Sequence, residues 1–120
     1  MDAERIKVMN HELVVVLTTT EKRDDAERIA QALVQGRLCA CAQVSGPIRS
    51  WYWWEGKLEN AEEWLVRLKT TSAKYEKAEE AIRAVHPYDL PQIIALPVTK
   101  AYDPYIDWVV DNLDTKAADK

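Results

Sequence analysis

The sequence contains no phenylalanine, only three glycines and only two cysteines in 120 residues. Two cysteines separated by a single residue, Cys39 and Cys41, do not make the disulfide framework of a small secreted domain. A glycine-rich phosphate loop, a Ser-His-Asp order and a paired-carboxylate motif are all missing from the chain. No named enzyme class is therefore supported by a motif.

Long apolar runs and blocks of basic residues are missing as well. The longest apolar run, Leu13 to Leu17, is far too short to span a membrane. The net charge is −4 without a Lys/Arg cluster, so we expect no nucleic-acid partner. The first ten residues, MDAERIKVMN, lack an apolar signal core, and unpaired cysteines suit a reducing compartment. We therefore expect a cytoplasmic protein with no membrane partner.

The remaining patterns predict a single domain over residues 11–113, with flexible tails at 1–10 and 114–120. The predicted strands cover 11–20, 37–44 with a continuation over 48–59, 62–70 and 92–98, and the predicted helices cover 24–36, 72–85 and a segment that begins at Asp103-Pro104. Asp24 or Asp25, Ser72 and Asp103 are the expected helix caps. The order β-α-β-β-α-β-α predicts an α+β fold, a ferredoxin-like sandwich with an extra C-terminal helix and a long projecting β-hairpin.

The tip of that hairpin is expected at Asn60, although Glu55-Gly56 could form the turn instead, or a bulge. A strand from Leu38 to Leu58 would run about 65 Å, whereas a domain of this size has a radius of gyration of only about 14 Å. The strand must therefore break at Gly46-Pro47, project beyond its own domain, or both.

Four aromatic residues, Trp51 to Trp54, occupy consecutive positions of this hairpin. A strand points them alternately to opposite faces, and one small core cannot cover both sets. The first and fourth strands are also apolar on both faces, so the sheet face without helices is expected to be covered too. We favour contact with another subunit; the alternative is that the rings cover their own core and hairpin neighbours.

Several motifs in order resemble the CutA divalent-cation tolerance family. They are C-A-x-V from Cys41, Y-W-W-E-G-K from Tyr52, Glu63 before a strand ending Lys69-Thr70, H-P-Y-x-x-P from His86 followed by Ile93 to Pro97, and Y-x-x-W from Tyr105, within residues 12–113. The resemblance implies a ferredoxin-like fold, a homotrimer that pairs the long hairpin strands, a likeness to PII-type signalling proteins, and a link to copper and other divalent metals. It implies no settled reaction.

His86 and Cys41 are the expected metal ligands. Soft thiolates suit Cu(I) or Zn, and a histidine in a proline-fixed loop can be a metal ligand or a proton donor. The alternatives are that both thiols are small buried hydrophobes and that His86 shapes the turn. Cys39 and Cys41 are expected on the sheet face away from the helices. Some family members carry a cysteine where this chain has Thr18 and a second histidine at Val85, so copper or another divalent metal is expected to bind weakly.

A ligand-binding cleft between subunits is expected from Trp54, Glu63, Lys69 and Tyr88, near His86. Charges of both signs beside aromatic rings would suit a small anionic or zwitterionic ligand, whereas solvated cross-strand charge pairs are the alternative. The leading hypothesis is a binding protein with a metal-tolerance or regulatory role. The others are an enzyme of unknown reaction that uses His86, Lys69 and Glu63, and a structural assembly module.

Overall fold

The computed structural model describes residues 12–113, so His11 and the expected tails lie outside the described residues. The strands are β1 (Leu13–Thr20), β2 (Cys41–Trp54), β3 (Lys57–Thr71) and β4 (Ile94–Pro97), and the helices are α2 (Arg23–Gln35), α3 (Tyr75–Val85) and α4 (Asp103–Asp111), with a short 3-10 turn, η1 (Ser72–Lys74), before α3. This is the predicted order of an α+β fold. None of the helices within 12–113 combines the length and apolar character that crossing a membrane requires.

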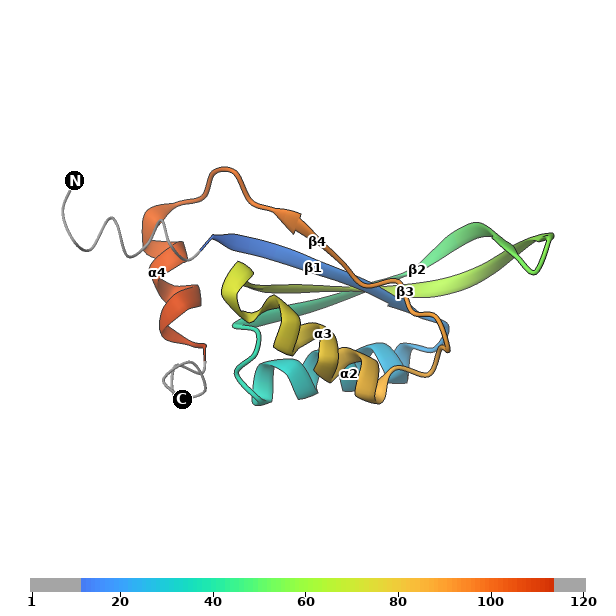
Figure 1. Cartoon of the computed structure of the whole chain (residues 1–120), viewed down its shortest axis with the longest axis horizontal. Coiled ribbons are helices and arrows are strands. Elements are labelled where there is room, and N and C mark those ends of the chain that lie inside the picture. The colour runs from blue at the N-terminus through green and yellow to red at the C-terminus, as the bar shows by residue number, and fades with distance from the viewer. Residues whose placement is uncertain (1–11, 114–120) are drawn as a thin grey trace.

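The four strands form one antiparallel sheet in the order β2-β3-β1-β4. Helices α2 and α3 lie side by side on one face of this sheet, and α4 lies at the end opposite the projecting hairpin (Figure 1). The sheet order and the two helices on one face correspond to the ferredoxin-like arrangement.

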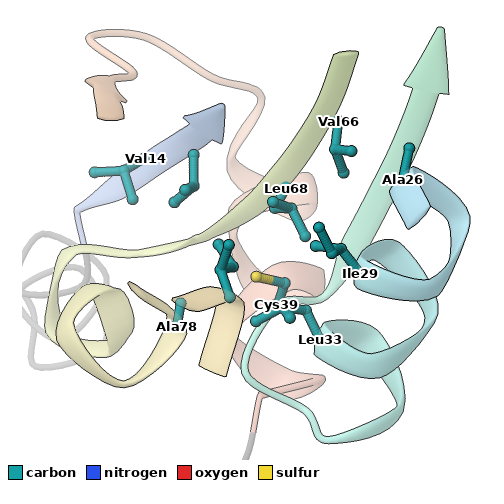
Figure 2. Close-up of a cluster of buried hydrophobic side chains, with 10 residues drawn as sticks. Val14, Ala26, Ile29, Leu33, Cys39, Val66, Leu68 and Ala78 are labelled. Carbon is teal, nitrogen blue, oxygen red and sulfur yellow. The ribbon is translucent and has the colours of Figure 1, made fainter. Parts of the chain in front are cut away.

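The main core lies between the sheet and helices α2 and α3 (Figure 2). Its side chains come from alternate strand positions and from helix positions three or four residues apart, because those spacings point to one face. The largest fully buried apolar members are Val16, Ile29, Leu33, Val66, Leu68 and Ile82. Helix α4 forms a smaller, separate cluster with Leu13, which neighbours core residue Val14 on β1 and so points to the other face.

The second sheet face is covered by α4 only at one end. We call the apolar residues that β1, β3 and β4 leave on it the open face: Val15, Leu17, Leu65, Ile94 and Leu96. The side chains of Ile94 and Leu96 are 44% and 48% exposed. The second face was expected to be covered. Within the chain, only the end beneath α4 is covered.

The β2–β3 hairpin both bends and projects. Its pairing skips from Ser45–Leu65 to Ile48–Glu63, and a side chain at Gly46, which has a φ of 154°, would lie 2.8 Å from the Trp64 ring. Beyond this bulge the hairpin leaves the rest of the domain, giving extents of 54 × 27 × 23 Å (Figure 1).

The four aromatic side chains of the hairpin do not cover the chain's own core. Trp51 and Trp53 are 64% and 72% exposed, and Tyr52 and Trp54 are also exposed. The alternative in which they pack over their own domain is therefore wrong for the single chain.

The hairpin turn lies at Glu55-Gly56 rather than at Asn60. Both turn residues have positive φ, 50° and 79°, as a two-residue turn that matches strand twist requires. Asn60 is instead paired with Trp51, and its side chain accepts a hydrogen bond from Arg49 (2.7 Å). The acidic residues around Asn60 suggested a loop, but they are exposed strand positions.

The predicted helix caps are wrong, because the preceding segments set where each helix begins. Helix α2 starts after Lys22, η1 precedes α3, and α4 starts after Tyr102, without a side-chain capping hydrogen bond at these positions.

The predicted start of the second strand is also wrong. Arg37 has a φ of 58°, and the next two backbone N–H groups donate to the Leu33 carbonyl, so the strand begins only at Cys41.

Candidate functional site

A groove of about 640 Å³ lies between the hairpin and the loop that joins α3 to β4. Three parts of the chain that are distant in sequence meet here. They are the end of β1 with the residue after it (Thr19, Glu21), the two hairpin strands (Ser50, Trp51, Tyr52, Trp54, Ala61, Glu63) and the loop after α3 (Tyr88, Asp89, Leu90, Gln92). The groove forms because β1 ends opposite Trp64, so the loop lies beside β3 beyond that point.

Glu63 and Tyr88 form the polar centre of the groove. The Glu63 side chain is buried, with 8% of the residue exposed, and its Oε2 accepts a hydrogen bond from the Tyr88 hydroxyl at 2.8 Å. Burial, this hydrogen bond and the charges of Glu63 and Glu21 raise the pKa of Tyr88 above its usual range. The Tyr88 phenol therefore remains a proton donor at neutral pH.

His86 lies beside Tyr88 and holds the loop against the end of β1. Its Nδ1 accepts the backbone N–H of Tyr88 (3.1 Å), while its Nε2 lies 2.9 Å from the Thr19 carbonyl and 3.1 Å from Thr18 Oγ1. Since Nδ1 accepts, Nε2 carries the proton and donates to the carbonyl. Burial lowers the pKa of His86, against the opposing effects of Thr19, Asp25 and Glu63. The geometry therefore favours a neutral imidazole that shapes the loop.

Three of the four predicted cleft residues come together, because Trp54, Glu63 and Tyr88 all line the groove. Lys69 does not. It is six positions from Glu63 along β3, or about 20 Å, and its Nζ donates to Gln43 Oε1 (3.1 Å) and lies 6.0 Å from the centre of the Tyr105 ring. Within one chain, the expected pairing of Glu63 with Lys69 in a single cleft is therefore not formed.

The two predicted metal ligands lie on opposite faces of the sheet. His86 contacts Thr18, which lies two positions from core residue Val16 and so on the same face as the core. Cys41 instead pairs with Lys69 on the face away from α2 and α3. In the part of the chain that the structure describes, no group of three His, Cys, Asp or Glu side chains could hold a metal ion.

The two cysteines are both unpaired but differ in surroundings. Cys41 is half-buried on the face expected for both thiols. Cys39 lies instead in the core between the sheet and the helices (Figure 2), because the chain has not yet entered β2 there. Burial, with a smaller effect of Cys41, raises the pKa of the Cys39 thiol to about 12. The expected placement is thus wrong for Cys39, and its thiol is a poor metal ligand.

Sequence reasoning missed the acidic lining residues Glu21 and Asp89. Each follows a segment that was identified, β1 in one case and the His86-Pro87-Tyr88 motif in the other. The order of the strands, which no local sequence pattern encodes, brings them to the same groove.

The chain matches the family model described as "CutA1 divalent ion tolerance protein" over residues 14–112. It is 39% identical over 98 residues to the divalent-cation tolerance protein CutA of Thermus thermophilus, covering 82% of this chain and 95% of that protein. It is 42% identical over 84 residues to the human protein CutA, covering 70% of this chain and 47% of that protein.

Solved structures agree with the sequence comparison. The Thermus thermophilus divalent cation tolerance protein superimposes with a TM-score of 0.83 at 37% identity, covering 85% of this chain and 99% of that one. CutA1 from Oryza sativa superimposes with a TM-score of 0.84 at 31% identity, covering 87% and 95%. With the motifs, the sheet order and the projecting hairpin, these matches show that the chain belongs to the CutA divalent-cation tolerance family.

Proposed function

We propose that the protein is a cytoplasmic homotrimer that acts in tolerance of, or response to, divalent metal ions. In this proposal it binds copper or a similar ion, or a small ligand, at clefts between subunits, with an architecture like that of PII-type signalling proteins. Membership of the divalent-cation tolerance family supports the role in metal tolerance. Relatives are named chloroplastic and periplasmic, so the cytoplasmic location rests on the features of this sequence.

The exposed apolar surface carries the oligomer part of the proposal. The open face exposes Leu96 (48%), and the hairpin exposes Trp53 (72%) with its cross-strand neighbour Leu58 (61%). Large apolar side chains exposed in groups are typical of interaction sites, and a projecting two-stranded ribbon is only marginally stable by itself. Self-association would cover both surfaces, and a closed ring is a common symmetric solution.

The separation of His86 and Cys41 supports a metal site between subunits rather than within one. A site that used both side chains would need His86 of one copy and Cys41 of another, with Glu63 as an alternative carboxylate ligand. His86 would also have to release one of its two ring hydrogen bonds, to Thr19 or from Tyr88, before it could coordinate a metal. Both features favour weak binding.

Binding of Cu(II) should weaken as the pH falls, because the metal and the proton compete for the same nitrogen. The pKa of His86 is lowered from 6.5, so this competition sets in below that pH. Within residues 12–113, Lys69 is remote from His86 and Glu63, so one chain does not bring together the three side chains of the enzyme hypothesis.

The proposal is tested by sedimentation velocity followed by calorimetric titration with CuCl₂ and ZnCl₂. We expect a trimer without added metal and weak Cu(II) binding that His86→Ala largely removes. His11→Ala, which removes the other histidine of the chain, is the matched control and should leave binding unchanged. A monodisperse monomer would contradict the oligomer. Tight copper binding that survives His86→Ala would contradict the ligand assignment, and absence of binding by any metal would leave an assembly module.

A further inference from the structure

The hairpin bends where β2 has two residues, Gly46 and Pro47, and β3 has only one, Trp64. Two residues opposite one form a β-bulge, which bends a strand and increases its local twist. Trp64 is also the last residue of β3 that pairs with β1, through Thr20. Beyond this point the two hairpin strands leave the rest of the sheet together (Figure 1). The bulge therefore lies at the boundary between the domain and the projecting part of the hairpin.

The Trp64 ring is fixed to the domain on the side of the helices. It packs against the main core between the sheet and α2 and α3. The guanidinium of Arg23, the first residue of α2, lies 5.5 Å from the centre of the ring, and the face of an aromatic ring attracts a cation. Both contacts are made within one chain, so they do not depend on what covers the exposed hairpin rings.

Gly46 allows the β2 backbone to lie against this ring. A Cβ atom at position 46 would lie 2.8 Å from Cε3 and 3.0 Å from Cδ2 of Trp64, and 3.2 Å from the backbone oxygen of Glu63. Carbon atoms in contact are normally about 3.5–4.0 Å apart. Since Cδ2 and Cε3 belong to a rigid ring that is packed on the core, the ring cannot simply turn away. The bend of β2 at this point therefore requires a residue without a side chain.

A small change of this bend would be large at the end of the hairpin. The segment of β2 beyond the bulge, Ile48 to Trp54, is about 20 Å long, so a rotation of about 10° at the bulge would move its end by about 3.5 Å. The exposed rings, such as that of Trp53, lie on this segment. Contacts between copies form a closed ring only if the rotation from one copy to the next closes, and they otherwise form open assemblies.

We propose that the contact between Gly46 and Trp64 sets the direction of the hairpin and thereby determines whether copies of this chain close into a ring. The inference rests on the homotrimer of the proposed function. It adds the intramolecular contact on which the geometry of that trimer depends, at a place distinct from the groove and from the exposed rings themselves.

The proposal is tested by sedimentation velocity of the full chain over a range of concentrations. In Gly46→Ala, the added methyl group must displace either the Trp64 ring or the β2 backbone, so the hairpin should take a different direction. We expect the closed trimer to weaken at least about tenfold, with monomers or larger open assemblies in its place. Circular dichroism should still show a folded domain, because the helices and their core lie away from the bulge.

Gly56→Ala is the matched control. Gly56 lies in the same hairpin and also has a positive φ, 79°, but a Cβ atom there would have none of the described atoms within 4 Å. This variant therefore introduces an unfavourable backbone conformation without the contact. It should leave the trimer closed.

Trp64→Leu is a second variant that adds no atom at the bulge. It removes the ring against which β2 bends, so the closed trimer should weaken here too, and this result decides the question if Gly46→Ala fails to fold. Leu68→Ala is its control, because it removes a fully buried side chain from the same strand without changing the bulge. It should lower the stability of the domain and leave the trimer closed.

A closed trimer in both Gly46→Ala and Trp64→Leu would refute this inference alone. Equal weakening by Gly56→Ala would assign the effect to any strain in the hairpin, and equal weakening by Leu68→Ala would assign it to general instability. Either result would overturn the proposal. If the unaltered protein is a monomer, the proposed oligomer and this inference are both refuted.

Discussion

Strands β1 and β4 are apolar on both faces of the sheet, yet only one face is fully covered within the chain. Val16 and Leu68, on the face under α2 and α3, have no exposed surface, whereas Ile94 and Leu96 on the open face are about half exposed. Both sets lie in the same small sheet, so the strands do not differ in kind. The chain covers one face with α2 and α3 but the other only at one end with α4, and the apolar surface left over is what a partner would cover in the proposed oligomer.

The comparison separates two sources of stability. Core packing under the helices is intramolecular, so its contribution is the same at every protein concentration. Burial of the open face and the hairpin rings, in the proposed oligomer, follows mass action and grows with concentration.

The largest effect is expected from Trp53→Ser combined with Trp54→Ser. Each ring that the proposed oligomer buries would contribute roughly 2–3 kcal/mol, repeated in every subunit, so the oligomer should dissociate or unfold. Sedimentation equilibrium measures the change. Trp108→Ser, at an exposed tryptophan on α4 at the opposite end of the molecule, is the control and should leave the oligomer intact. An unchanged assembly in the double variant would place the interface elsewhere.

A matched pair on β3 compares the two faces directly. Leu68→Ala removes a fully buried core side chain and should lower the free energy of unfolding by roughly 2–5 kcal/mol. Leu65→Ala, three positions away on the open face, should cost less at low protein concentration and more as concentration rises. Urea denaturation at two concentrations tests both. A concentration-independent cost for Leu65→Ala would argue against burial of the open face by a partner.

His86→Ala should have an intermediate effect, because two ring hydrogen bonds of roughly 0.5–1.5 kcal/mol each are lost. The pKa of His86 is lower in the folded chain than its unfolded value of 6.5, so the folded state favours the neutral ring. Its stabilisation is therefore complete above pH 6.5 and declines as the pH falls toward the folded pKa. Urea denaturation at pH 7 and pH 5 should show a shallower acid loss in His86→Ala than in the unaltered protein. An identical acid loss would mean that other groups dominate.

The smallest effects on stability concern the two thiols. In single-cysteine variants made with Cys39→Ala or Cys41→Ala, the half-buried Cys41 should react quickly with a thiol reagent, and Cys39 should react only as the core opens. Since the pKa of Cys39 is raised to about 12 from an ordinary value of 9.0, the folded state favours its neutral form. The corresponding stability is present below pH 9 and is lost as the pH rises toward 12. Equal labelling rates would show that Cys39 is not in a closed core.

Much of the architecture could be predicted because it depends on local periodicity. Alternating or continuous apolar strands, and helix stripes such as Ala26, Ile29 and Leu33, encode the element order and the core face directly. The element ends could not be predicted in the same way. The acids around Asn60 indicated a turn, yet Glu55-Gly56 forms it, because positive φ at two successive residues matters more there than polarity.

The candidate site was predictable only in part, for a similar reason. Trp54, Glu63 and Tyr88 were expected near one another and do line one groove. Lys69 was expected with them but lies about 20 Å away, because six residues separate it from Glu63 along the extended strand β3. Cys39 was predicted to share a sheet face with Cys41, because side chains two positions apart on a strand point the same way. Strand β2 begins only at Cys41, so this rule does not apply to Cys39.

The sequence by itself determined the family, the order of strands and helices, and the presence of more apolar surface than one core can cover, because these follow from residue type and spacing along the chain. Only the tertiary structure decided which charges share the groove, which thiol is buried, and which apolar face remains open. Those properties depend on strand order and register, which bring together residues distant in sequence such as Glu63 and Tyr88. Contacts between distant residues are not encoded in any local pattern, and that is why the acidic character of the groove appeared only in the folded chain.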